Sequence, residues 1–348
     1  MDLAQTALRR NKLKNLALVE SVLIKHSAFE EASQRARQCI EYVKEGGREP
    51  ACLALVGESR TGKSRCIEGI LSQYPMTRTK NGIVCPVLAI VVPSKPTVKS
   101  LAERFLMKLK CPDWEKGTET QKTARLMELM VQCEVVALVV DEFHHFYDKG
   151  SHKVQHHVAD WLKNIVSESR VALIASGLKS LTSVIDQNEQ LAGRFGYPVT
   201  MPRFNWLDEE QRSEWRGILD GFNDVLSQTF DLPKLSNSQM SFRLYCATGG
   251  LIGYLTNTLR QAVWNAVDAG ANKISLEDLD RAYRRAIWKL EARTIAEEEV
   301  TPLSSAWSQK GSNEGAALAA LSVGLPAVEL PAKSTRAAKV SASSVLKA

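Results

Sequence analysis

The residues best suited to do chemistry form a glycine-rich loop early in the chain. Residues 57–64 read G-E-S-R-T-G-K-S and fit the pattern G-x-x-x-x-G-K-S, after an apolar run and before a helical pattern. Glycines let backbone N–H groups approach phosphate oxygens, and the amino terminus of a helix favours anions. In such loops the lysine, here Lys63, reaches the β- and γ-phosphates, and the hydroxyl, here of Ser64, coordinates Mg²⁺. A chance glycine-rich turn is the alternative. The cradle predicted for ATP contains Gly57, Glu58, Ser59, Arg60, Thr61, Gly62, Lys63, Ser64 and Arg65.

A pair of acidic residues ends another apolar run further along the chain. Residues 135–140 are apolar, and Asp141 and Glu142 follow directly. Asp141 would belong to the ATP site and hold the Mg²⁺ ion through water, and Glu142 would polarise the attacking water. Strand ends often carry an aspartate, so this motif is weak alone. Together with the phosphate loop it predicts a catalytic site for ATP hydrolysis, with Ser64 and Asp141 as the metal ligands.

Two more polar positions could complete this catalytic site. Ser176 follows the apolar run 172–175, where its hydroxyl would hydrogen-bond the γ-phosphate or the attacking water. The alternative is an ordinary turn from a strand into a loop. Arg194 lies in the segment 190–195, Q-L-A-G-R-F, and in a ring-forming ATPase an arginine at this place reaches the γ-phosphate of the neighbouring subunit. The alternative here is an exposed arginine at a helix end.

The elements that must position these residues alternate between short apolar runs and helical patterns. Such alternation predicts an α/β fold with a parallel sheet covered by helices on both faces. The expected buried strands cover 52–56, 84–92, 135–140 and 171–175, and the helices between them cover 97–110, 120–132 and 153–168. After Pro202 the pattern becomes all-helical, with helices expected at 209–226, 236–247, 253–269 and 276–292.

The chain therefore divides into four segments. We expect a helical segment at 1–48, a nucleotide-binding core at 49–205, a helical lid domain at 206–295 and a flexible, weakly basic tail of low complexity at 296–348. The tail assignment depends on an Ala- and Ser-rich composition, on prolines and on the lack of a core-forming pattern.

Overall composition bounds the kind of protein. The 348 residues hold 45 Lys and Arg against 39 Asp and Glu, a net charge of +6, which permits a nucleic-acid partner without demanding one. No apolar run is long enough for a transmembrane helix and no signal pattern is present, so no membrane association is expected. The seven cysteines are scattered and form no C-x-x-C pair. Reduced thiols in a cytoplasmic protein are therefore expected.

Most of the histidines lie close together in the sequence, at His144, His145, His152, His156 and His157. His152 and His156 have the spacing of zinc-ligand pairs on helices. No cysteine lies nearby, and the neighbouring acidic residues fit no ligand spacing, so a metal site is the less favoured interpretation. A position beside the nucleotide site or at a subunit contact is favoured.

The order of these features is that of an AAA+ ATPase: a strand, a phosphate loop, an acidic motif, a polar strand end, an arginine and a helical lid. Within that class, the order resembles the initiator-like branch. Residues 140–146, V-D-E-F-H-H-F, followed by Gly150 and Ser151, resemble the corresponding region of the TniB/TnsC family of transposition ATPases. The segment 190–195 is similar to that family's arginine-finger segment. The resemblance covers about residues 15–290.

This resemblance implies a concrete activity. Members of the family bind ATP, assemble on double-stranded DNA as rings or helical filaments, and mark target DNA. They recruit a DDE transposase and, in some systems, a TniQ-type adaptor. ATP hydrolysis then disassembles the filament.

A group of lysines after the second expected strand is the candidate DNA surface, because this region faces the central channel in initiator-like ATPases. The residues expected to contact DNA are Lys95, Lys99, Lys116 and Thr118. Lysines on phosphates would bind without sequence preference and with strong salt dependence. A solvated face on a slightly basic protein is the alternative.

The lid departs from many AAA+ proteins in one respect. Residues 249–253, G-G-L-I-G, carry no arginine, and the next one is Arg260. A lid arginine that senses the γ-phosphate in cis is therefore in doubt, and Arg194 would have to supply most of the charge compensation.

Two other functions remain open at this point. A STAND-type signalling NTPase would carry an effector domain and sensor repeats, which this sequence lacks. A replication initiator or helicase loader of the same ATPase branch would be expected to end in a winged-helix domain, which the tail does not resemble.

Overall fold

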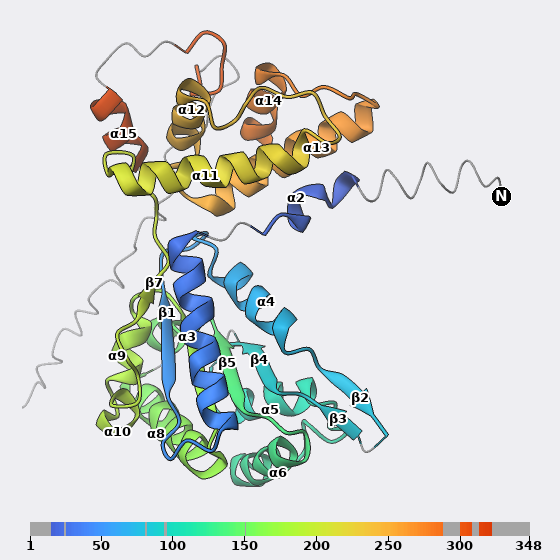
Figure 1. Ribbon diagram of the computed structural model, residues 1–348. Coiled ribbons are helices and arrows are strands. Elements are labelled where there is room, and N and C mark those ends of the chain that lie inside the picture. Colours follow the sequence, from blue (N-terminus) through green and yellow to red (C-terminus); the bar gives the residue numbers. More distant parts are fainter. Residues whose placement is uncertain are drawn as a thin grey trace, which may run out of the picture.

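A five-stranded parallel sheet forms the centre of the core (Figure 1). The computed structural model describes residues 15–23, 26–80, 82–93, 96–149, 151–287, 300–307 and 313–321. The strands lie in the order β4-β5-β6-β1-β7, with every neighbouring pair parallel. Their bounds are β1 Cys52–Val56, β4 Val87–Val91, β5 Ala137–Asp141, β6 Ala172–Gly177 and β7 Val199–Thr200. Strands β1, β5 and β6 are buried along their whole length, as expected for a parallel sheet covered on both faces.

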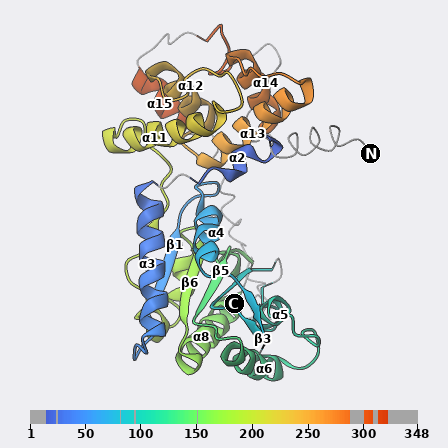
Figure 2. The same ribbon diagram turned by 45° about the vertical axis from the view of Figure 1, so that its right-hand side comes forward.

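Helices cover both faces of this sheet (Figure 2). One face packs against α3 (Ser27–Lys44) and α4 (Lys63–Gln73), and the other against α5 (Val98–Lys108), α6 (Glu119–Gln132) and α8 (His152–Ser169). Shorter helices follow β5 and β6, namely α7 (His145–Lys149), α9 (Leu181–Ile185) and α10 (Glu189–Ala192). Side chains of β1 alternate between the two apolar clusters, because successive side chains of a strand point to opposite faces. The expected α/β fold is confirmed.

The strand expected at 84–92 is wrong in its first half. Residues up to Val84 instead close an antiparallel hairpin, made of β2 (Thr77–Thr79) and β3 (Gly82–Val84), and the sheet strand β4 begins only at Val87. Pro86 separates the two, and a proline lacks the N–H that a central strand needs for its ladder.

The expected all-helical lid is also present. It consists of α11 (Glu209–Leu226), α12 (Ser238–Thr248), α13 (Ile252–Ala269) and α14 (Leu276–Ala286), which share a separate apolar core. Ser275 caps α14 through a capping box with Asp278, as its position before the helix predicted. In Figures 1 and 2 the lid sits on one end of the core.

Part of the expected flexible tail is packed. Thr301 and Leu303 are buried, and α15 (Asn313–Leu321) packs against α12 through Ala317 and Ala320. Arg243 of α12 donates hydrogen bonds to the carbonyl oxygens at positions 302 and 304. The tail prediction is therefore wrong for 300–307 and 313–321, because small alanine side chains allow a close helix contact without large apolar residues. The rest of 296–348 lies outside the described residues.

The described residues before the core form helices on two different parts of the molecule. A short helix α2 (Leu18–Ser21) packs against α11 and α13 of the lid, and α3 then begins at Ser27 on the core. Val19 belongs to the apolar core of the lid. Residues near the amino terminus thus hold the lid against the core.

Two expectations from composition can be compared with the structure. In the described ranges no helix is both long and apolar enough to cross a bilayer. The seven cysteines all lie in described positions, and none of them forms a disulfide.

Candidate nucleotide-binding site

The phosphate loop joins the carboxyl end of β1 to the first turn of α4. Its backbone has positive φ at Arg60 (68°) and Gly62 (96°). At Gly57 a Cβ atom would lie 2.7 Å from the carbonyl oxygen of Met201, so only glycine fits this close approach. The loop therefore has the tight wrap that its sequence predicted, ending at the amino terminus of a helix, where anions bind favourably.

Lys63 lies at the centre of this loop. Its Nζ donates hydrogen bonds to the carbonyl oxygens of Gly57, at 2.9 Å, and Glu58, at 2.6 Å. Burial lowers the pKa of Lys63, while the carboxylates of Glu142 and Asp141 act in the opposite direction. The ammonium group is thus held inside the curve of the loop by two of the loop's own carbonyl oxygens.

Ser64 and Asp141 meet at the base of the loop. The hydroxyl of Ser64 donates to Oδ2 of Asp141 at 3.0 Å, and Oδ1 of Asp141 accepts from the backbone N–H of Glu142 at 2.9 Å. A hydroxyl and a carboxylate are hard oxygen donors of the kind that Mg²⁺ prefers. Their side chains, 77 positions apart in sequence, are brought together and fit the predicted metal site.

Glu142 and Ser176 complete the same edge of the sheet. Glu142 follows β5 with a positive φ of 57° and lines one cavity together with Lys63 and Ser64. Ser176 lies near the carboxyl end of β6, and its carbonyl oxygen accepts from the N–H of Phe143 at 2.8 Å. The hydroxyl of Ser176 is buried, has no hydrogen-bond partner among the described residues and does not line the cavity at this edge.

The cavity at this edge has a volume of about 410 Å³ and lies between the phosphate loop, the N-terminal segment and the lid. The phosphate loop contributes polar and charged lining, and further such lining comes from Glu20, His26, Glu68, Glu142, Thr256, Asn257 and Arg260. The apolar lining consists of Val19, Val22, Leu23, Phe29, Met201, Ile218, Phe222 and Ile252. Charged groups beside an extended apolar wall suit a ligand with a phosphate chain and a planar base.

The lid is seated directly on the phosphate loop. The N–H of Gly253 donates to the carbonyl oxygen of Arg60 at 2.8 Å, and the guanidinium of Arg60 lies 4.7 Å from the centre of the Tyr254 ring. A Cβ atom on Gly253 would lie 2.7 Å from Cβ of Arg60. Glycine at this position lets helix α13 touch the loop.

Arg260 is a cavity residue that the sequence analysis did not place in the site. Ile252, Thr256 and Arg260 are spaced by four, so they share one face of α13, and all three line the cavity. Arg260 is also paired with the carboxylate of Glu20 on α2. The sequence did carry a signal for this position: Arg260 follows Ile252 by about two helical turns, which brings both residues to the same face of the helix.

Arg194 lies away from this cavity. Its carbonyl oxygen accepts from the N–H of Cys52, at the amino end of β1, whereas the phosphate loop leaves the carboxyl end of that strand. Its Nη1 donates to the hydroxyl of Ser167 at 2.8 Å. Arg194 and Lys63 are therefore at opposite ends of the sheet of one subunit.

The residues expected to contact DNA lie around α5 and its connection to α6. Lys95 is outside the described residues, and Lys99 is exposed on α5. Lys116 is exposed and pairs with Asp113 at 2.8 Å. Thr118 caps α6, where its hydroxyl accepts from the N–H of Gln121, so this threonine has a structural role of its own.

The histidines separate into two groups. His156 pairs with Asp160 at 2.9 Å and His157 with Glu119 at 2.7 Å, both at the surface of α8. The group of potential metal ligands found among the described residues is a different one, Glu142 with His144 and His145.

Comparison with known proteins agrees with this geometry. The family model of the bacterial TniB protein matches residues 14–206, more than half of the chain. A search of curated proteins finds no significant match.

Several solved structures have a similar fold. The ORC2 protein of Aeropyrum pernix, in ADPNP–ADP complexes, has a TM-score of 0.55 at 12% identity, over 79% of this chain and 70% of that chain. Cdc6p of Pyrobaculum aerophilum has a TM-score of 0.55 at 14% identity, over 77% of this chain and 73% of that chain. The ORC1 protein of Aeropyrum pernix in complex with DNA has a TM-score of 0.54 at 15% identity, over 78% of this chain and 69% of that chain. These matches bear out the expected fold, an α/β core with a parallel sheet followed by a helical lid.

Proposed function

The chain belongs to the TniB family, and we propose that it is an ATPase that assembles on double-stranded DNA and regulates DNA transposition. The observation that carries the catalytic part is that Lys63, Ser64 and Glu142 line one cavity, while Asp141 lies beside it, hydrogen-bonded to Ser64 and to the backbone of Glu142. These residues come from two distant motifs, and their roles in phosphoryl transfer are complementary.

In the proposed reaction each residue has a defined task. Lys63 binds the β- and γ-phosphates, and Ser64 and Asp141 hold Mg²⁺, which neutralises charge on the phosphate oxygens. Glu142 orients a water molecule and accepts its proton as the oxygen attacks the γ-phosphorus. The buried hydroxyl of Ser176 donates a hydrogen bond to the γ-phosphate or to that water.

The lid and the N-terminal segment would hold the base and part of the phosphate chain. The apolar cavity wall offers a surface for adenine, and buried His26 lines the same wall with its Nδ1 unpartnered among the described residues. Arg260 supplies a lid cation in cis. A bound nucleotide would have to compete with Glu20 for that guanidinium.

We assign Arg194 to the site of a neighbouring subunit. Its place at the amino end of β1 leaves no direct path to the phosphate loop of its own subunit. Hydrolysis would then depend on assembly, because an arginine that stabilises transition-state charge arrives only with a docked neighbour. A ring or helical filament on DNA satisfies this requirement.

The DNA surface proposed for this assembly is the region of Lys95, Lys99, Lys116 and Thr118. Exposed lysines at Lys99 and Lys116 can neutralise phosphates of a duplex without reading its sequence. The partners that the family assignment supports are a DDE transposase and, in addition, a TniQ-type adaptor. The likeness to ORC and Cdc6 proteins concerns the fold, so we prefer transposition to the function of a replication initiator.

The proposal is tested by measuring phosphate release from ATP with and without duplex DNA, over a range of protein concentrations. We expect hydrolysis that rises with DNA and rises more than linearly with protein. Electron microscopy of the same samples should show oligomers on DNA with ATP. A protein that hydrolyses ATP at a rate independent of DNA and of its own concentration would contradict the proposal.

A further inference from the structure

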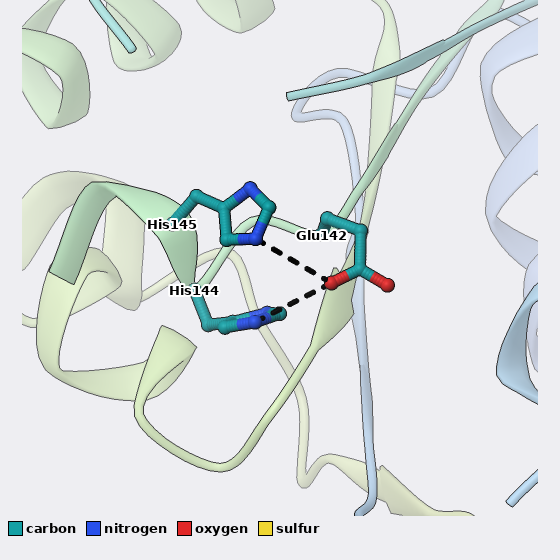
Figure 3. Close-up of side chains that lie close together, drawn as sticks. All are labelled: Glu142, His144 and His145. Atoms are coloured by element: carbon teal, nitrogen blue, oxygen red, sulfur yellow. Dashed lines mark ion pairs between the residues drawn. The ribbon is translucent and has the colours of Figure 1, made fainter. Parts of the chain in front are cut away.

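The carboxylate of Glu142 lies against two histidine rings. Figure 3 shows one carboxylate oxygen directed at both rings, while the other oxygen points away from them. The facing oxygen, Oε2, is 3.3 Å from Nε2 of His144 and 3.9 Å from Nε2 of His145. His144 is the closer of the two, and it is buried.

The position of the proton on His144 follows from its other ring nitrogen. Nδ1 lies 3.3 Å from the backbone N–H of Leu178, which can only donate, so Nδ1 accepts. Burial lowers the pKa of His144 below its usual value, although Glu142 and Asp148 act in the opposite direction. A neutral imidazole carries one proton, which must therefore be on Nε2, the atom that faces Glu142.

A metal ion bound by Glu142, His144 and His145 is disfavoured by the same contact. A ligating Nε2 needs a free lone pair and leaves the proton on Nδ1, where it would meet the N–H of Leu178. Nδ1 of His145 is buried without a partner among the described groups, so it lacks the acceptor that usually orients a metal-bound histidine. Three ligand atoms lie close together, but their hydrogen-bond partners do not suit a cation.

The approach of His144 to β6 requires Gly177. A Cβ atom on Gly177 would lie 2.9 Å from Nδ1 of His144 and 3.1 Å from its backbone nitrogen. His144 is thus docked on the carboxyl end of the strand that carries Ser176, with Leu178 holding the far side of its ring.

We propose that His144 is a positioning residue for the hydrolytic carboxylate: Leu178 fixes its tautomer, and its Nε2–H holds Oε2 of Glu142 so that the other oxygen is directed at the attacking water. This inference deepens the proposed function and rests on it. The second carboxylate near Nε2, Asp148, is further away, at 3.8 Å. Hydrogen bonds of catalytic groups often become shorter and straighter once substrate is bound, so the contact with Glu142 can tighten with ATP.

The role predicts an effect on turnover rather than on binding. Glu142 accepts a proton only if its free oxygen points at the water, and a misplacement of about 1 Å can reduce a rate by about 100-fold. The polar contacts of His144 are with Leu178, Glu142 and Asp148, none of which belongs to the phosphate loop, so nucleotide affinity should depend little on it.

The test compares His144→Ala and His144→Gln with the wild-type protein on duplex DNA. We expect His144→Ala to lower kcat by about 10- to 100-fold while the Kd for a non-hydrolysable ATP analogue changes by less than about 3-fold. A glutamine carries an N–H donor on a side chain of similar reach, so His144→Gln should recover a large part of kcat. His156→Ala removes an exposed histidine that pairs with Asp160 and serves as the matched control.

A double variant separates positioning from a general structural effect. If His144 acts through Glu142, adding His144→Ala to Glu142→Gln should lower the residual rate no further, because residues that act as a unit are not additive. A full additional loss in the double variant, or an unchanged kcat in His144→Ala, would overturn the inference. Equal losses of kcat and analogue binding in the alanine and glutamine variants would overturn it too. The wild-type rate distinguishes a failure of the proposed ATPase activity from a failure of the role of His144. An inactive wild-type protein contradicts the ATPase activity itself. An active wild-type protein with an equally active His144→Ala variant contradicts only the positioning role.

Discussion

The two ends of the core sheet differ in what they hold. At the carboxyl ends of β1 and β5, motifs from distant parts of the sequence meet: Lys63, Ser64 and Glu142 line one cavity, and Asp141 accepts a hydrogen bond from Ser64. At the amino end of β1, Arg194 lies beside Cys52 and Ser167 and does not line that cavity. In open α/β sheets, ligands bind outside the carboxyl ends of the strands, so an arginine at the amino end can act on a nucleotide only from another subunit.

The largest expected effect is at the carboxyl end. Lys63→Ala removes the cation that meets the β- and γ-phosphates, so we expect ATPase activity and ATP-dependent assembly on DNA to be lost. Lys273→Ala, at an exposed lysine of the lid paired with Asp231, is the matched control. Sedimentation with duplex DNA and ATP measures assembly. Undiminished ATP-dependent filaments of Lys63→Ala would show that the cavity is not the nucleotide site.

Arg194→Ala should have the next largest effect and a different character. We expect nucleotide binding close to normal and hydrolysis slower by about 10³-fold, the scale of other arginine fingers. Ser167→Ala removes only the hydroxyl that accepts from Arg194 and should change the rate much less. Parallel measurements of analogue affinity and phosphate release separate the two properties. A loss of affinity equal to the loss of rate would indicate that Arg194 binds nucleotide in its own subunit.

Substitutions at the proposed DNA surface should have a smaller effect, and they should weaken DNA binding about equally for duplexes of different sequence. The pair of substitutions Lys99→Glu and Lys116→Glu removes two phosphate contacts, so the slope of log affinity against log salt should become shallower by about 2. The single reversal Lys273→Glu on the lid shows how much a charge reversal away from this surface changes the slope. Titrations of duplexes of different sequence at several salt concentrations provide the slopes. The same slope as in the wild-type protein would move the DNA surface elsewhere.

The packed segment after the lid should affect stability and leave chemistry alone. Leu303 is fully buried against the lid, so Leu303→Ala should lower the free energy of unfolding by about 2–5 kcal/mol. Leu318→Ala, at an exposed leucine of α15, should change it little. Denaturant unfolding followed by circular dichroism measures both. If Leu303→Ala were as stable as Leu318→Ala, residues 300–307 would not be packed and would belong to the flexible tail that the sequence predicted.

The catalytic motifs could be predicted because each is local. The phosphate loop is specified by consecutive residues between a strand and a helix, and Asp141 by the end of an apolar run. Their meeting follows from the geometry of parallel strands, whose carboxyl ends share one edge. The roles of these residues stay predictions until the variants are measured.

Contacts between distant elements could not be predicted in the same way. Arg260 reaches the cavity because Gly253 lets α13 approach the loop, and Glu20 reaches Arg260 because α2 lies under the lid. The paired histidines were visible in the sequence, but the tautomer of His144 depends on Leu178 at the end of another strand. The alanine-rich composition of α15 resembles that of a flexible tail. Its packing against α12 is a contact between distant segments, which the composition does not reveal.

The central claim is that a complete hydrolytic site takes residues from the opposite sheet ends of two subunits. Mixing Arg194→Ala with Glu142→Gln tests it most directly, because each variant is expected to be nearly inactive alone for a different reason. In a mixed oligomer on DNA, an intact Glu142 from one subunit can meet an intact Arg194 from its neighbour. We predict that phosphate release in the mixture rises clearly above the sum of the separate variants. Activity that never exceeds this sum, in samples shown to be mixed oligomers, would contradict the account.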